Sequence, residues 1–474
     1  MSALKRLANS PYLMCRLGVF AFCYSWLVGL CLQLWLIPMF FSQPGSADGL
    51  VILDSLGFDR IAKEKAAEIA SLGWSAWELR PRTNSPAGIA SAFYALFGPS
   101  PSSMLPFNAL VHALSACVVM SILRKFFSAL PAALGALVFV LNPASLEWVA
   151  QIHRDGVFIL GNLLFILGVL GLFENSRAEI PLEPWYCIKL LLAPIIGTLL
   201  VWMARPYWVQ IMLLSSLLVS IPFALSIRIR KGFHGRRLIA AVMLGVLISV
   251  QFCLARYHTP FEPADVALQS AISEEGTSRG ATLRGGTSGE STSQEVAREG
   301  HPYFWRQSSW LPGAIEERFF RMAIARRAAM TQGGNTLVDT DRRFNSAGEI
   351  VCYIPRALQL GLFSPLPELW GGQASTPAMT LARKVMGPIT IGLYVCLLGL
   401  VLGVYQLRRN ISVWMMLGLC FIGILLFALA YPNIGTLMRY RYGFYMLLIS
   451  FGVAFWTNFL LHSSRAESPQ QSRT

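Results

Sequence analysis

The chain has 474 residues, of which 54% are hydrophobic and only 14% are charged, and its mean hydropathy is +0.52. Soluble domains carry about 25% charged residues, so the composition excludes an ordinary soluble protein and predicts a polytopic membrane protein. The net charge of +14 comes from basic residues scattered between apolar runs, a pattern typical of cytoplasmic loops. These residues form no basic domain, so nucleic acid is not an expected partner.

The first apolar run covers about residues 18–41 and follows Lys5, Arg6 and Arg16. It is longer than the apolar core of a cleaved signal peptide, which has about 7–15 residues. We therefore expect an uncleaved first span with its N-terminus in the cytoplasm. The nine cysteines lie mostly in or beside apolar runs and include no CxxC pair, which predicts neither disulfides nor a zinc site.

Ten runs approach the roughly 20 apolar residues that one helical span requires. They cover residues 18–41, 104–122, 130–149, 156–173, 188–203, 206–226, 238–255, 386–406, 412–431 and 442–461. With the N-terminus inside, basic pairs such as Arg124-Lys125 and Arg408-Arg409 fall on the cytoplasmic side, as the positive-inside rule requires. The sequence thus predicts an all-α protein with about ten transmembrane helices and both termini in the cytoplasm.

The sequence predicts three parts and two long outer-face loops. Residues 1–255 form an N-terminal membrane module, residues 256–385 an outer-face region, and residues 386–474 a C-terminal membrane module. The first long loop, 42–103, lies inside the N-terminal module. Both loops carry patterns typical of short helices.

In the first loop, apolar residues at helical spacing over 58–72 predict an amphipathic helix, and residues 87–97 predict a second short helix. In the second loop, Ser, Thr and Gly dominate residues 268–300, which predicts a mobile segment. Residues 315–330 and 349–361 predict helices that lie along the membrane surface.

Four arginines lie at the outer ends of the predicted spans, on the side where basic residues are disfavoured: Arg154, Arg205, Arg439 and Arg441. Charged groups at membrane depth are expensive and indicate function. Because a guanidinium binds phosphate through a planar fork, the four predict a site for a lipid-linked phosphate or diphosphate. Alternatively, each arginine reaches anionic headgroups or pairs with a nearby glutamate.

The last outer turn adds Asn433 and Thr436 as candidate hydrogen-bonding groups for a bound substrate. If residues 436–441 begin the last helix, its N-terminus presents backbone amides to an anion. The alternative is a plain re-entry turn anchored by Tyr440 and Tyr442.

Asp54 and Asp59 follow the first span, where an apolar run meets water. A carboxylate at the outer face is suited to take a proton from an acceptor hydroxyl, which makes Asp54 a candidate catalytic base. Alternatively, Asp54 caps a helix that begins near Ser55. Asp59 is a candidate substrate-binding group, although its basic neighbours Arg60 and Lys63 favour a solvated surface charge.

The short turn before the fourth span reads Gln151-Ile-His-Arg-Asp155. Asp155 is a candidate to orient the substrate or a divalent cation, and it serves equally well to pair with Arg154 or to cap the next helix. His153 is a candidate substrate-binding group, with local hydrogen bonding as the favoured alternative. No Gly-rich loop or Asp-Phe-Gly accompanies this His-Arg-Asp, so it is not a kinase catalytic loop.

In layout, residues 18–255 resemble the GT-C superfamily of membrane glycosyltransferases, especially bacterial protein mannosyltransferases and lipid A aminoarabinose transferase. The likeness lies in Asp54 near the start of the first outer loop, Phe58 and Ala62 after it, and Asp155 in a later short turn. The family usually has a second acidic residue beside the first and Tyr as the aromatic, where this chain has Ser55 and Phe58. The turn from Asn433 to Arg441 is also similar to turns in membrane proteins of bacterial polysaccharide loci.

The resemblance implies an inverting glycosyltransferase in the bacterial inner membrane, with a GT-C fold and an active site on the periplasmic face. Asp54 would be the base, assisted by Asp155. The implied partners are a polyprenyl-phosphate-linked sugar donor, membrane lipids, and a glycan, lipid or protein acceptor. The chain has no Walker or Rossmann glycine motif, which agrees with a donor that carries no nucleotide; a divalent cation is the one cofactor left open.

Two other functions fit the same features. A polysaccharide polymerase or ligase acting on a lipid diphosphate would depend on the arginines and tolerate loss of Asp54. A lipid-oligosaccharide transporter or an assembly subunit is the third. Transporters often place polar groups deep inside their spans, whereas the charges here gather at span ends.

Overall fold

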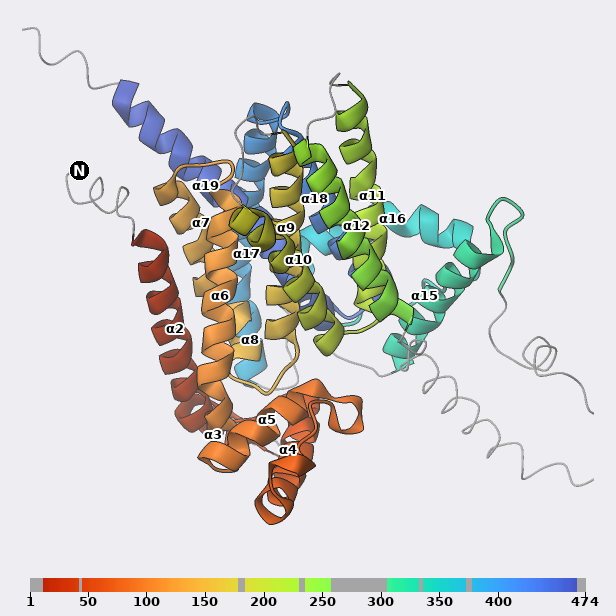
Figure 1. The fold of residues 1–474 in the computed structure, drawn as a ribbon. Helices are drawn as coiled ribbons and strands as arrows, with labels where there is room; N and C mark the ends of the chain where they lie inside the picture. The colour runs from red at the N-terminus through yellow and green to blue at the C-terminus, as the bar shows by residue number, and fades with distance from the viewer. Residues whose placement is uncertain are drawn as a thin grey trace, which may run out of the picture. The chain divides into compact units, whose positions relative to one another are not determined.

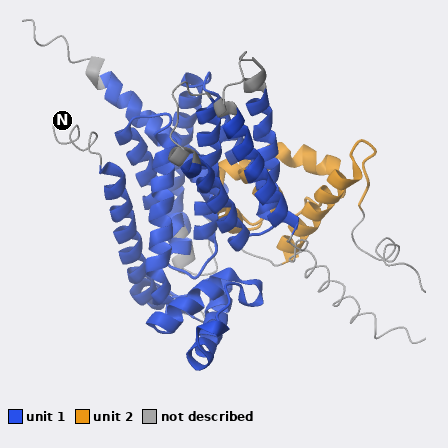
Figure 2. Cartoon of the chain, in the orientation of Figure 1, with its two compact units in different colours: residues 1–258, 367–422, 442–474 blue, residues 259–366, 423–441 orange. Residues whose placement is uncertain are grey.

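The protein is described by a computed structural model that covers residues 12–41, 45–177, 184–229, 235–256, 305–331, 336–371 and 377–466. These residues form helices and, apart from two isolated β-bridges, no extended pairing. The chain divides into two compact units (Figure 2). Unit 1 consists of residues 1–258, 367–422 and 442–474, and unit 2 of residues 259–366 and 423–441. The predicted mobile segment 268–300 lies outside the described residues.

The chain is a multi-pass membrane protein by the length and apolar character of its helices (Figure 1). Seven stretches are long and apolar enough to cross a membrane: Leu13–Phe40, Pro101–Leu123, Asp155–Ser176, Leu238–Arg256, Arg383–Gln406, Ile411–Ala430 and Ile434–Ser463. An eighth is the pair Ala129–Leu141 and Pro143–Val149, which is bent by 55°. The other two predicted spans are helical but shorter, because their described apolar parts cover only Ile188–Ala204 and Trp208–Ala224.

The helices of these stretches are named as in Figure 1. They are α2 (Leu13–Cys31) with the π-helix η1 (Leu32–Leu36) and α3 (Ile37–Phe40), α6 (Leu105–Leu123), α7 (Ala129–Leu141), α8 (Leu146–Val149), α9 (Asp155–Arg177), α10 (Pro184–Ala204), α11 (Trp208–Ile229), α12 (Gly235–Arg256), α17 (Pro377–Gln406), α18 (Ile411–Ala430) and α19 (Ile434–Ala466).

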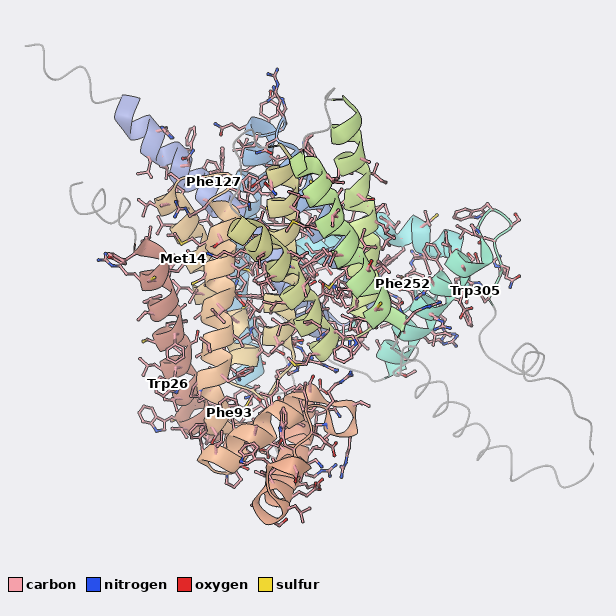
Figure 3. The ribbon with its side chains drawn as sticks, in the orientation of Figure 1. Met14, Trp26, Phe93, Phe127, Phe252 and Trp305 are labelled. Atoms are coloured by element: carbon pink, nitrogen blue, oxygen red, sulfur yellow. The ribbon has the colours of Figure 1, made fainter. Side chains whose placement is uncertain are left out.

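Helix α9 lies at the centre of unit 1, since 83% of its apolar stretch is buried, against 28% for α2. Trp26, Leu27 and Trp35 of the first span are exposed, and Figure 3 shows Trp26 pointing away from the bundle. Exposed apolar side chains on long helices are what a lipid-facing surface requires. The first span is therefore peripheral, and the chain around α9 is interior.

Helices α9 and α10 form an antiparallel hairpin whose backbones nearly touch. A Cβ on Gly161 would lie 2.8 Å from the Gly197 carbonyl oxygen, and a Cβ on Gly197 would lie 2.5 Å from that of Gly161. Only glycine allows this approach, which is the small-residue contact typical of membrane helices. The hairpin brings the first residue of α9, Asp155, beside the residue that follows α10, Arg205.

The first outer loop contains α4 (Leu53–Leu72) and α5 (Ser85–Phe97), which lie together at one end of the unit 1 bundle (Figure 1). Both predicted helices are confirmed. Their common core consists of Phe58, Ala62, Ala66, Ala87, Ala90, Tyr94, Met104 and Ile152. Small alanines on both helices allow a close approach, and Ile152 attaches this core to the turn that precedes α9.

Unit 2 contains α15 (Gly313–Thr331) and α16 (Ala347–Phe363), which confirms the two short helices predicted in the second loop. Its third part is residues 423–441, which include the start of α19. Trp305 donates from Nε1 to Glu316 Oε1 at 2.9 Å, so this aromatic residue packs within unit 2. Trp310 is 62% exposed.

Candidate functional site

The turn before α9 is held in place by side-chain amides. Gln33 donates to the Ala150 carbonyl at 2.6 Å, and Gln151 donates to the Gly49 carbonyl at 2.8 Å. Gln151 also accepts from the Val51 amide at 3.0 Å. Buried amides with several partners fix a backbone in one position. These bonds hold the start of α4 against the turn that carries His153, although about 100 residues separate the two in sequence.

Asp54 lies in the first turn of α4, one residue after the helix begins. The helix starts at Leu53, with Ile52 as its N-cap, and Ile52 makes no side-chain capping bond. The alternative in which Asp54 caps a helix starting near Ser55 is therefore wrong. Its carboxylate lies near the positive end of the α4 dipole, and 46% of the side chain is exposed.

Asp54 and Asp155 are brought together through His153, which the sequence did not predict as the link. His153 Nε2 lies 3.8 Å from Asp54 Oδ2, and His153 Nδ1 lies 3.0 Å from Asp155 Oδ2. The imidazole is completely buried, and the Phe58 ring meets it edge-on at a centroid distance of 6.5 Å. One imidazole therefore stands between an exposed and a buried carboxylate.

Arg205 forms an ion pair with Asp155, and both side chains are only 1% exposed. The same guanidinium donates to the Tyr207 hydroxyl at 3.3 Å and lies over the Phe158 ring. Two buried charges persist together only when they are paired and hydrogen-bonded. Arg205 is thus engaged by Asp155 and does not point to solvent, as a phosphate ligand on an open turn would.

Arg154 is the arginine of this turn that has no acidic partner. Its side chain is half-buried, its Nε has no hydrogen-bond partner, and no carboxylate pairs with it in the described part of the chain. The alternative in which Asp155 pairs with Arg154 is wrong, because Asp155 pairs with Arg205 instead. A guanidinium held near the membrane rim without a counter-ion is suited to an incoming anion.

A small cavity adjoins His153 and Arg154. Its volume is about 10 Å³, and its other lining residues are Ser85, Pro86, Ile89, Met104, Phe107, Val157, Met203 and Ala204. A space of this size holds one water molecule at most. The exposed side of Asp54 is the part of this site that is open to larger molecules.

Asp59 is buried and is not the solvated charge that its neighbours favoured. It is 7% exposed, accepts from the Tyr94 hydroxyl at 2.6 Å, and pairs with Lys63 at 2.8 Å. Burial and the bond to Asp59 raise the pKa of Tyr94, and the bond to Asp59 raises the pKa of Lys63. Asp59 therefore connects α4 to α5, and its partners lie within the protein.

Arg441 and Arg439 belong to unit 2. The Arg441 guanidinium is 2% exposed and donates to the carbonyls of Leu360, Gly361 and Ser364. These carbonyls end α16, where a positive charge is favoured by the helix dipole. Arg441 thus caps a helix, while Arg439 stays half-exposed, 5.5 Å from the centre of the Tyr440 ring.

Asn433 caps α19, which begins at Ile434. Its Oδ1 accepts from the Gly435 and Thr436 amides at 3.0 and 3.4 Å and from the Thr336 hydroxyl at 2.8 Å. Of the two alternatives for the last outer turn, the structure has the helix start, at Ile434, but the first amides of this helix are already occupied by the capping side chain. They are not open to an anion.

Unit 2 contains two arginines with partners that the sequence did not indicate. Arg326 is 2% exposed, and its guanidinium lies 4.9 and 4.8 Å from the ring centres of Phe344 and Tyr353. Arg356 binds Asp339 in a two-point contact of 2.9 and 3.0 Å. The arginine-rich sequence of α15 gives no sign that Arg326 is buried. Aromatic residues near the arginines were the available indication of a cation–π contact.

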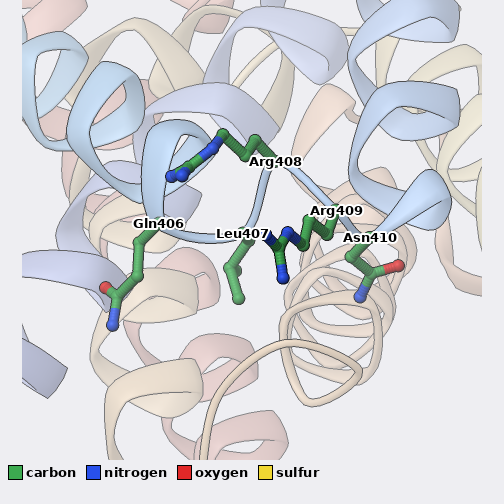
Figure 4. Close-up of a pocket in the computed structure, with 5 residues that line it drawn as sticks. All are labelled: Gln406, Leu407, Arg408, Arg409 and Asn410. Atoms are coloured by element: carbon green, nitrogen blue, oxygen red, sulfur yellow. The ribbon is translucent and has the colours of Figure 1, made fainter.

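The described residues contain no candidate metal centre and one open hollow away from His153. Within the described residues, no group of three or more His, Cys, Asp or Glu side chains could hold a metal ion. The eight cysteines there are free. A larger open hollow of about 620 Å³ lies at the turn between α17 and α18, lined by Gln406, Leu407, Arg408, Arg409 and Asn410 (Figure 4). It carries no carboxylate or nucleophile, which distinguishes it from the site at His153.

No known protein supplies a function by similarity. No protein-family model, no curated protein and no solved structure matches this chain. The site is therefore defined by its geometry alone: an exposed carboxylate, a buried imidazole and ion pair behind it, and an unpaired guanidinium in the same turn.

Proposed function

We propose that the chain is an inverting glycosyltransferase that moves a sugar from a polyprenyl-phosphate-linked donor to a glycan, lipid or protein acceptor. The observation that carries this proposal is Asp54, an exposed carboxylate held beside His153 and its buried Asp155–Arg205 pair. An enzyme that activates a hydroxyl needs such a base at a fixed position.

In the proposed reaction, Asp54 removes the proton of the acceptor hydroxyl as its oxygen attacks the anomeric carbon of the sugar. The bond between that carbon and the phosphate oxygen breaks on the opposite face, so the configuration inverts. The lipid phosphate leaves with the electron pair. Arg154 binds the phosphate through its guanidinium, whereas Arg205 is engaged by Asp155.

The surrounding protein supports this chemistry by pre-organisation. Asp54 is placed by α4, and the turn carrying Arg154 is placed by the amides of Gln33, Gln151 and Asn108. A general base contributes about 10²–10⁴-fold to a rate when its position is fixed. Positioning of this kind needs no nucleotide and no metal cluster.

The proposal includes a ten-span arrangement of the GT-C kind in a bacterial inner membrane, with both termini in the cytoplasm. The helices α10 and α11 are then the two shorter spans, each containing a proline, Pro194 or Pro222. This arrangement puts Asp54, His153 and Arg154 on the periplasmic side. Polyprenyl-linked sugars would reach them from the outer leaflet.

The test is the substitution Asp54→Asn in the full-length chain, assayed with a panel of polyprenyl-phosphate hexoses whose sugar is labelled. We expect transfer to fall by about 10²–10⁴-fold, with unchanged elution and melting of the purified protein. Asp48→Asn is the matched control, because Asp48 precedes α4, is exposed, and pairs with Lys63 at 3.5 Å. Full transfer by Asp54→Asn would remove the proposed base.

The unpaired guanidinium of Arg154 also favours a second function, a polymerase or ligase acting on a lipid diphosphate. Such an enzyme would lose activity in Arg154→Ala and keep it in Asp54→Asn. The glycosyltransferase requires both residues. Assaying the two variants together on monophosphate and diphosphate donors separates the two functions.

A further inference from the structure

Arg80, which was not among the arginines predicted to bind phosphate, lies at the same helix end as Arg154. Its guanidinium stands over the Trp202 ring, 5.3 Å from the ring centre, and Trp202 belongs to the last turn of α10. Arg154 lines the small cavity to which the next residue of that turn, Met203, also contributes. Ser85, the first residue of α5, joins the two segments, because its hydroxyl donates to the Met203 carbonyl at 2.6 Å and its side chain lines the same cavity.

Neither Arg80 nor Arg154 has an ionic partner among the described residues. The Nε atoms of both arginines are buried, as is the Trp202 indole nitrogen, and none of the three makes a hydrogen bond in the part of the chain that the structure describes. The acidic residue nearest to Arg80 in sequence, Glu78, pairs with Lys65 at 2.9 Å instead. Buried N–H groups without an acceptor are costly, so three of them at one helix end indicate a ligand that supplies the acceptors.

The loop that carries Arg80 is strained and closely packed. Arg82 and Thr83 have φ angles of +49° and +67°, in the left-handed region where a β-branched residue such as threonine is rare. A Cβ on Gly88 of α5 would lie 2.2 Å from the Leu79 carbonyl oxygen, so only glycine lets the loop lie this close to the helix. Backbone strain of this kind persists mainly at sites that hold a ligand, and Arg80 is the charged side chain between these two features.

Two guanidinium groups match the charge of the leaving group better than the charge of the donor. The phosphate of a polyprenyl-phosphate sugar is a diester with a single negative charge. When the bond between the anomeric carbon and the phosphate oxygen breaks, that oxygen keeps the electron pair, and the polyprenyl phosphate leaves as a monoester. The monoester gains a second charge above its second pKa, about 6. A second guanidinium therefore contributes most where that charge develops, which is how binding lowers a barrier.

On the basis of the proposed function, we propose that Arg80 and Arg154 together bind the phosphate of the polyprenyl carrier at the end of α10, and that this site prefers the departing monoester to the donor diester. Each guanidinium binds oxygens of the same phosphate through its planar fork, and the Trp202 indole is a further donor. The acceptor proton goes to Asp54, so the arginines stabilise charge and take up no proton. Polyprenyl phosphate is then an inhibitor of the reaction that releases it.

A binding experiment tests this preference without any activity. Farnesyl phosphate, a monoester, and farnesyl methyl phosphate, a diester, are titrated into the purified full-length chain in detergent by calorimetry. At about pH 8 we expect the monoester to bind about tenfold more tightly, the effect of one additional charge-assisted contact. At about pH 5 the monoester also carries close to one charge, so the two probes should bind nearly equally. Equal binding at the higher pH would overturn the proposal, as would inorganic phosphate binding as tightly as farnesyl phosphate, since that result describes a site for a free anion.

Variants of Arg80 separate phosphate binding from packing. Arg80→Met keeps a long side chain over Trp202 without the charge, so the preference for the monoester should disappear. Arg80→Lys keeps the charge and should retain most of the preference; a loss as complete as in Arg80→Met would show that charge is not the cause. Arg82→Gln is the matched control, because Arg82 lies in the same loop, is 63% exposed and pairs with Glu64 at 2.9 Å. A preference that survives in Arg80→Met would mean that Arg80 only packs on Trp202.

The binding and transfer measurements distinguish failure of this site from failure of the proposed function. Equal binding of the two farnesyl probes, together with sugar transfer that depends on Asp54, overturns the phosphate site and leaves the glycosyltransferase standing. A monoester preference that depends on Arg80, without transfer from any donor, overturns the glycosyltransferase, and the site then binds a prenyl phosphate for another reaction.

Discussion

At the residue scale, the buried ion pair of Asp155 and Arg205 in unit 1 tolerates the loss of neither partner. Both charges are 1% exposed, so neither has water to replace a lost partner. The Phe158 ring under the guanidinium adds a cation–π contact at 4.9 Å. Such a pair contributes less to stability than to specifying one arrangement, because removing either partner leaves an isolated buried charge.

Arg205→Met should therefore destabilise the protein strongly. Breaking a buried ion pair costs about 3–5 kcal/mol, and thermal melting in detergent should show a clear drop in Tm. The double variant Arg205→Met, Asp155→Asn should recover part of that loss, since it leaves no isolated charge. Equal melting of the single variant and the unaltered protein would show that water reaches this pair.

The sequence predicted which residues lie in this site better than it predicted the contacts between them. Asp54, Asp155, His153 and Arg154 were all recognised as candidates, and the structure gathers them around one turn. The sequence did not indicate which arginine pairs with which acidic residue. Asp155 pairs with Arg205, fifty residues away, and not with its neighbour Arg154, because the α9–α10 hairpin sets the partner and chain proximity does not.

At the scale of elements, side chains from distant segments cap or hold helix ends. Arg441 caps α16 from another helix, and Asn433 caps its own helix, α19. Capping by a neighbouring residue follows known sequence patterns, so the start of α19 was predictable. Capping across about 80 residues follows no local pattern, and Arg441 was consequently predicted to bind phosphate.

The loop before α16 should show a pH-dependent stability that comes from Asp339. The bond from Arg356 holds the pKa of the Asp339 carboxyl below its usual value, with a further contribution from the Tyr353 hydroxyl. Burial raises the pKa of Tyr353 to about 12, so its hydroxyl stays protonated as a donor. A depressed pKa gives stability that is complete above the unfolded value, about 3.9, and that is lost as pH falls below it.

We therefore expect the difference in Tm between the unaltered protein and Asp339→Asn to be constant above about pH 5 and to shrink as pH falls below about 4. Asp341→Asn is the matched control. Asp341 is 78% exposed, and its ion pair with Arg342 at 3.5 Å is open to solvent. This variant should therefore melt like the unaltered protein at every pH. A difference for Asp339→Asn that grew on acidification would contradict the assigned direction of the pKa shift.

At the scale of the whole molecule, hydrophobic runs predicted where helices lie but not how many cross the membrane. All ten predicted spans are helical, and seven meet the length and apolar criteria outright. The bend of 55° at Asn142-Pro143 and the short described parts of α10 and α11 account for the other three. Run length alone does not distinguish a short span from a helix that enters the membrane and returns.

The predicted orientation places α16 outside and the start of α2 inside. Cys352 on α16 and Cys15 on α2 are both exposed, so each can serve as a single-cysteine reporter in an otherwise cysteine-free chain. In spheroplasts, a maleimide that does not cross membranes should label Cys352 and should label Cys15 only after permeabilisation. The reverse pattern would place both termini outside the cytoplasm and the site at Asp54 and His153 on the cytoplasmic side.

The π-helix Leu32–Leu36 in the first span carries a final consequence. Its wider turn directs Gln33 inward, 3% exposed, to the Ala150 carbonyl, while Trp35 two residues later is 71% exposed. Deleting one residue there would rotate everything before it by about 100° relative to everything after it. The first span can therefore exchange one apolar side chain for another wherever it meets lipid. The number of residues between Cys31 and Ile37, in contrast, is fixed by the bond from Gln33 to the distant Ala150 carbonyl.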